Sequence, residues 1–76
     1  DSFGAAVMVV ELSKKNSPSL GADQFLVLLQ GSAKAFLPGE DAPEDLELLD
    51  TVAGGADQPQ VFGRGFAAVV SFYPLG

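Results

Sequence analysis

Apolar residues occupy both faces of the two terminal segments, and this feature constrains the fold more than any other. Residues 3–10, FGAAVMVV, contain no charged or polar side chain, and the three β-branched valines among them disfavour a helix. Residues 60–73 place large apolar side chains on one face of an extended chain and mostly smaller ones on the other. A segment that is apolar on both faces is typical of an interior strand. We therefore predict strands at 3–12 and 60–73.

The central segment 24–37, QFLVLLQGSAKAFL, fits two structures. At the helical period, a stripe of apolar and small side chains runs from Phe25 to Phe36, and the LPG motif at its end would stop the helix. As a strand, the apolar run FLVLL is short, and Gly31 would mark a bulge or turn. The tetrapeptide GADQ precedes both this segment and the C-terminal strand, and this internal echo supports the strand. We favour the helix, although periodicity alone does not decide for a short apolar run.

The acidic stretch GEDAPEDLELLDTVAGG, residues 39–55, predicts a helix more clearly. Asp41 stands three residues before Glu44, as in a capping box, and Pro43 lies in the first turn, where its missing N–H costs nothing. The glycine pair that follows is a common helix stop. On such a helix the leucines share one face. The opposite face carries the acidic residues Glu44, Glu47 and Asp50.

Together these elements predict a single small α+β domain over residues 1–76. Its N- and C-terminal strands would form the sheet, and one or two short helices would lie in the middle. The chain begins with Asp1 rather than Met, which is compatible with a processed, exported or organellar chain and with a subunit of a larger assembly. No apolar run approaches the ~18–20 residues that span a bilayer, so we expect no transmembrane segment.

The residue types that most enzymes and metal sites need are scarce. The chain has no Cys and no His, so it lacks disulfides, thiolate metal sites, the best nucleophile and the commonest general base. Ser32 and Lys34 would not face each other on a helix, and no serine has the G-x-S-x-G context. The acidic stretch lacks a calcium-loop pattern. We therefore predict no enzyme activity, no catalytic residue, no metal and no cofactor.

Composition suggests that the chain does not work alone. Hydrophobic residues make up 47% of it, and charged residues only 18%, below the roughly 25% of ordinary domains. A small domain has more surface per residue than a large one, so it should be richer in charged residues, not poorer. The apolar surface that this composition leaves exposed is best buried against a partner chain. Four basic residues against ten acidic ones, with a net charge of −6, argue against nucleic acid as that partner.

The leading hypothesis is a non-enzymatic subunit or interaction module that buries its apolar strands against another protein chain, in a hetero- or homo-oligomer. Its alternative is a secreted or inhibitory acidic effector, such as a toxin subunit or a blocker of a basic surface, with Glu44, Glu47 and Asp50 as the contact face. Arg64, within FGRGF, is a candidate anion contact, although a bulge or kink with a solvent-facing arginine is the simpler interpretation. The predicted apolar contact residues are Val7, Val9, Phe62, Phe66, Val70 and Phe72.

Overall fold

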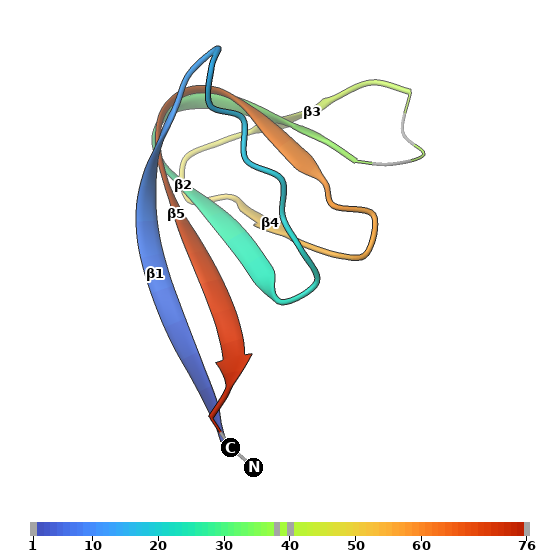
Figure 1. Ribbon diagram of the computed structural model, residues 1–76. Helices are drawn as coiled ribbons and strands as arrows, with labels where there is room; N and C mark the ends of the chain where they lie inside the picture. Colours follow the sequence, from blue (N-terminus) through green and yellow to red (C-terminus); the bar gives the residue numbers. More distant parts are fainter. Residues whose placement is uncertain (1, 38, 40, 76) are drawn as a thin grey trace.

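Strands, and no helix, form the regular structure of the part of the chain that the computed structural model describes, residues 2–37, 39 and 41–75 (Figure 1). All pairings are antiparallel, in the order β1-β5-β2-β3, and β4 also pairs with β2. The α+β prediction is therefore wrong, because this is an all-β chain with one sheet. The strands are β1 (Phe3–Leu12), β2 (Gln24–Phe36), β3 (Glu44–Leu46), β4 (Thr51–Ala53) and β5 (Gln60–Pro74).

The terminal strands lie where the sequence predicts them, but the helix favoured over 24–37 is a strand instead. β2 pairs with β5 along one side and with β3 and β4 along the other, so both sets of its backbone groups bond to neighbouring strands. A bulge at Leu29 changes which residues face the core: Leu26 and Leu28 before it, Ala33 and Ala35 after it. Because of this change, the buried positions along β2 do not alternate regularly, and their spacing resembles the apolar stripe of a helix. For this reason the periodicity favours the wrong structure.

The helix predicted over the acidic stretch is also absent from its described residues, which form β3, a turn and β4. The Asp50 carboxylate accepts a hydrogen bond from the Glu47 N–H (2.8 Å), and the Asp50 N–H donates to the Glu47 carbonyl (3.0 Å). Leu28 of β2 exchanges two backbone bonds with this turn, accepting from Leu49 and donating to Asp50. Acidic and polar residues compete well for local backbone groups, so the same residues can close a turn as readily as they cap a helix.

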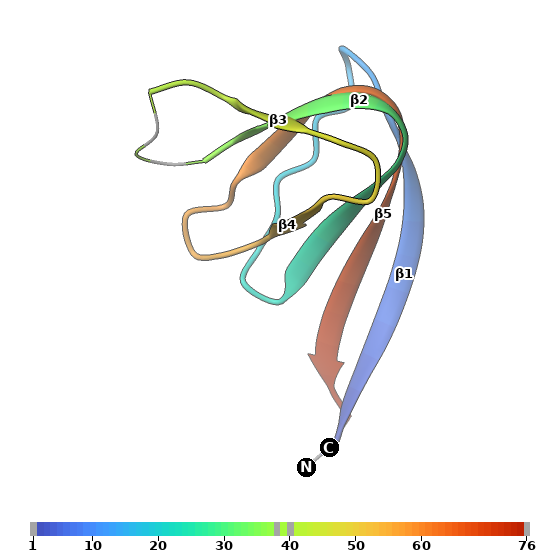
Figure 2. The same cartoon turned by 180° about the vertical axis from the view of Figure 1, so that it is seen from behind.

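The core lies on one face of the sheet, which we call the inner face. The loop between β1 and β2 covers it, held by backbone bonds from the Leu20 N–H to the Pro59 carbonyl (2.9 Å) and from the Val61 N–H to the Pro18 carbonyl (3.0 Å). Figures 1 and 2 show this loop, with β3 and β4, inside the bend of the long strands. The buried hydrophobic residues are Leu12, Leu20, Leu26, Leu28, Ala33, Ala35, Val52, Val61 and Ala67.

Beyond the start of β2, β1 and β5 continue as a two-stranded arm. β2 begins at Gln24, opposite Ser71, whereas β5 continues to Pro74, opposite Phe3 of β1. The arm points away from β3 and β4 in both views (Figures 1 and 2). The Cα radius of gyration is 12.4 Å, against about 11.4 Å expected for a chain of this length. The molecule is therefore elongated, and part of its sheet lacks a covering layer.

Candidate protein-interaction surface

β1 forms one edge of the sheet, because β5 is its only partner among the described strands. The Leu75 N–H donates to the Ser2 carbonyl (2.9 Å), which makes Ser2 and Leu75 a hydrogen-bonded pair. Such pairs occur at every second residue of an antiparallel ladder, so the even-numbered residues of β1 bond to β5. The odd-numbered residues turn their N–H and C=O groups to the open side.

The side chain of Asn16 supports this assignment. Its amide donates to the carbonyl of Glu11 (2.5 Å), which is also odd-numbered and therefore points away from β5. Glu11 is thus covered by the turn that follows β1. The residues of β1 whose backbone groups face the open edge without such cover are Phe3, Ala5, Val7 and Val9.

The same four residues belong to the outer face of the sheet, the face opposite the core. Cross-strand neighbours share a face, so Val7 lies in a row with Val70 and Phe25. The next row consists of Val9, Ala68 and Val27 and is also apolar. The rings of Phe25 and Phe72 lie 5.6 Å apart between centroids. None of these side chains is buried. We define the outer face as Phe3, Ala5, Val7, Val9, Phe25, Val27, Phe66, Ala68, Val70 and Phe72.

Exposure is greatest along β1. Phe3 is 73% exposed, Val7 67% and Val9 62%, and Met8 on the opposite side of the strand is 67% exposed. The loop and β4 cover the inner face only near the body of the molecule, so the arm is bare on both sides. Residues 3–10 of this edge strand carry no charge, and such an edge is a template for pairing with another chain unless something covers it.

The structure brings most of the predicted apolar contact residues together. Val7, Val9, Phe66, Val70 and Phe72 all lie on the outer face, contributed by β1 and β5. Phe62 shares that side of β5 but lies past the bend, where its ring meets Phe36 edge-on at 5.9 Å.

The predicted contact set lacks the other five residues of the outer face. Phe25 and Val27 fall in the predicted helix, and a strand assignment would have placed them on this face. Phe3, Ala5 and Ala68 belong to the predicted terminal strands, where their even spacing from the valines on the same strand is a sufficient signal.

The acidic residues lie at the other edge of the sheet. Glu44, Glu47 and Asp50 are all exposed there. The neighbouring Asp45 pairs with Lys34 at 3.7 Å, and both side chains are more than half exposed, so this ion pair contributes little stability.

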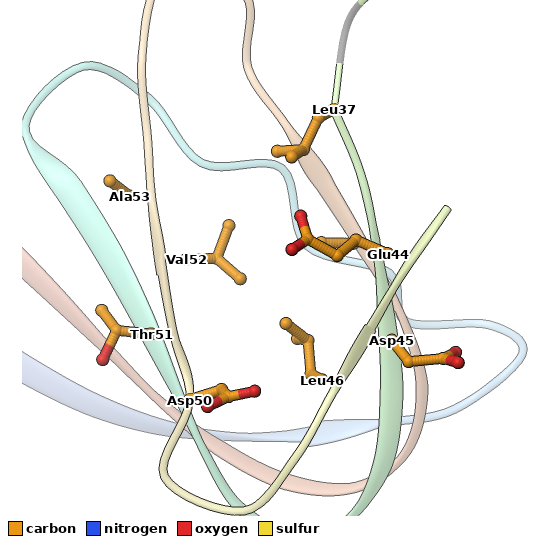
Figure 3. A pocket seen from close by; sticks show the side chains of 9 residues that line it. Leu37, Glu44, Asp45, Leu46, Asp50, Thr51, Val52 and Ala53 are labelled. Carbon is orange, nitrogen blue, oxygen red and sulfur yellow. The ribbon is translucent and has the colours of Figure 1, made fainter. Parts of the chain in front are cut away.

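Between β3 and β4, Glu44, Asp45 and Asp50 border an open hollow of about 480 Å³ (Figure 3). The carboxylates of Glu44 and Asp50 point toward it from opposite sides, Leu46 and Val52 line it, and Asp45 points away. No cluster of three or more potential metal ligands occurs within the described ranges. The hollow is thus an open depression of mixed lining, with carboxylates at its rim.

Arg64 is exposed on β5, just past the end of β1 and opposite Ser32 of β2. The glycines on either side of it allow β5 to lie close to β2. A Cβ on Gly63 would overlap the Ser32 carbonyl oxygen, and a Cβ on Gly65 would overlap the Gln30 carbonyl oxygen. The unusual FGRGF string is therefore explained by close strand approach at the bend. Lys14 borders the same hollow as Arg64.

Comparison of the chain with protein-family models, with curated proteins and with solved structures gave no match. Among the residues that the structure describes, no helix is long and apolar enough to span a membrane.

Proposed function

We propose that this protein is a non-enzymatic interaction module whose outer face and open β1 edge are buried against another polypeptide. The observation that carries the proposal is the surface area. The chain exposes 5108 Å², whereas a self-sufficient monomer of 7.8 kDa is expected to expose about 4,400 Å². The excess of roughly 700 Å² is close to the ~800 Å² that each partner buries in an interface of standard size.

The chemistry of the exposed residues supports the same proposal. The outer face carries aromatic and branched aliphatic side chains from three adjacent strands, and its one charged neighbour in β1, Glu11 opposite Phe66, lies at its end. This is the composition of the buried centre of an interface. An isolated sheet of this kind would be expected to aggregate, since neither its outer face nor its β1 edge has cover. A partner chain removes both sources of instability at once.

Met8 offers a direct test, because it is the single methionine and lies exposed on β1. Hydrogen peroxide converts an exposed methionine to its sulfoxide, which mass spectrometry quantifies. We expect Met8 to be oxidised more slowly in the native source than in the purified chain at high dilution, since a partner covers β1 in the former. Equal oxidation rates, with the purified chain shown to be folded, would contradict the proposal.

A second candidate function is contact with a basic protein through the acidic edge, as an effector or blocker. It is supported by the exposure of Glu44, Glu47 and Asp50 on one side of the molecule. Affinity for a basic partner should then fall steeply as ionic strength rises, and charge reversal at these three positions should abolish it. Binding through the outer face would be insensitive to both changes.

A further inference from the structure

From the geometry of the β1 edge we infer that the partner is a second copy of this chain, joined by antiparallel pairing of β1 with β1. This inference rests on the proposed function and specifies its partner. The open edge presents backbone groups of four odd-numbered residues, Phe3, Ala5, Val7 and Val9. A strand that pairs there needs a matching set of free groups and side chains without charge, and β1 itself meets both conditions.

Symmetry selects the pairing register. In an antiparallel two-fold pair centred on Ala6, Phe3 lies opposite Val9 of the second copy and Ala5 lies opposite Val7. All four open residues then form hydrogen-bonded pairs, each exchanging two backbone bonds. Glu11, whose carbonyl Asn16 already occupies, is not needed. Because odd residues face odd residues, the outer faces of the two copies join into one continuous apolar surface. The pairing itself covers the two β1 edges and leaves this joined surface exposed, so it accounts for the edge part of the proposed function.

Ala6 sits at the symmetry axis of this arrangement, opposite its own copy. It would form a non-hydrogen-bonded pair, in which Cα atoms approach to about 4.5 Å and side chains crowd. Alanine is small enough for that position. The flanking pair joins Gly4 with Met8, again a small residue opposite a large one.

Charge and shape favour a dimer that closes at two copies. The acidic residues of β3 and of the turn that follows it lie at the sheet edge opposite β1, so these negative regions of the two copies stay far apart despite a net charge of −6 on each chain. In one chain the arm points away from β3 and β4 (Figure 1), so the antiparallel arrangement would send the two bodies to opposite ends of the paired strands. At the other edge, β3 and β4 are each only three residues long, and β3 carries Glu44 and Asp45, which disfavours further strand addition.

Val7→Pro tests the pairing. Proline at this position removes an N–H that faces the open edge and leaves the bonds to β5 intact, so the fold should survive. We expect the wild-type chain to sediment as a dimer over ~1 to ~100 µM and Val7→Pro to raise the dissociation constant about tenfold or more. The circular dichroism spectrum should not change. A folded Val7→Pro variant that dimerises as tightly as the wild type would overturn the inference.

Cysteine cross-linking tests the register without relying on a proline variant. The chain has no cysteine, so Ala6→Cys introduces one thiol at the expected axis, within the Cα separation that a disulfide needs. Ala56→Cys, at an exposed position in the loop before β5, is the matched control. Mild oxidation should convert Ala6→Cys to a covalent dimer far faster than Ala56→Cys. Equal rates would overturn the proposed pairing.

The two proposals fail in different ways. If the purified chain is monomeric throughout this range while Met8 is protected in the native source, the partner is a different protein and the interaction module stands. If Met8 is unprotected in the native source, the interaction module fails, and the inference of a β1 dimer fails with it.

Discussion

Gly31 lies directly opposite Gly65 across β2 and β5, and both residues have positive φ, 96° and 134°. A Cβ on Gly31 would overlap the carbonyl oxygen of Arg64, and a Cβ on Gly65 would overlap that of Gln30. The pair stands just past the bulge at Leu29, well inside the paired region of β2 and β5. Close approach of two glycines thus allows β2 and β5 to bend together around the core.

Gly65→Ala should destabilise the protein. An alanine at this φ costs about 1–2 kcal/mol, and the overlap with β2 adds to it, so we expect a loss of about 2–4 kcal/mol in the free energy of unfolding. Urea denaturation measures the change. Gly55→Ala is the control, because nothing lies within 4 Å of the added Cβ, and it should change stability by less than about 0.5 kcal/mol. Similar losses in both variants would refute this explanation of the bend.

Leu28 and Leu29 provide a second matched pair. A helix would place both on one stripe, whereas the strand buries Leu28 completely and leaves Leu29 42% exposed at the bulge. Leu28→Ala should therefore cost about 3 kcal/mol through the cavity it leaves, and Leu29→Ala less than about 1 kcal/mol. Chemical denaturation of the two variants distinguishes the structures, since equal costs would indicate a helix.

In the turn between β3 and β4, glycine substitutions at two adjacent residues should change the free energy of unfolding in opposite directions. Leu49 is exposed and has a φ of 69°, which strains a residue with a Cβ. Leu49→Gly should relieve that strain and raise the free energy of unfolding by about 0.5–1 kcal/mol. Leu48→Gly, next to it and also exposed, should lower it by a similar amount, since glycine there only adds chain entropy. Thermal melting of both variants checks the signs, and a lower melting temperature for Leu49→Gly would be inconsistent with the turn.

The outer face can be tested with Val7 and a residue far from β1. Val7 is 67% exposed on the outer face, and Leu48 is 59% exposed in the turn between β3 and β4, at the opposite edge of the sheet. Val7→Lys places a like charge from each copy on the joined outer face, close to the symmetry axis, and should weaken assembly about tenfold. Leu48→Lys should have little effect. Size-exclusion chromatography with light scattering measures the difference, and an equal effect would show that the outer face has no special role.

The sequence predicts the terminal strands well because their evidence is local. β-Branched residues and apolar side chains on both faces, read within ten residues, are enough to identify β1, and β5 follows from the same pattern. The same local alternation predicts which residues share a side: it places Val7 with Val9, and Phe66 with Val70 and Phe72, on a single side of each strand, as the register of the sheet does.

The middle of the chain was not predicted, because two different structures satisfy its local signals. The bulge at Leu29 shifts the alternation of β2, and a shifted alternation resembles a helical stripe. Asp41, Pro43 and Glu44 are good helix-start residues, yet Leu49 and Asp50 bond to Leu28 instead of to their own segment.

By itself, the sequence determined that the chain has apolar strands at both ends and that it lacks Cys and His. It also determined that hydrophobic residues far outnumber charged ones. Only the tertiary structure decided that the middle is extended and that β5 lies between β1 and β2. It also decided that β1 is the edge strand. The physical reason is that strand pairing joins residues far apart in the chain, so the hydrogen bonds that choose between strand and helix cannot be read from one segment alone.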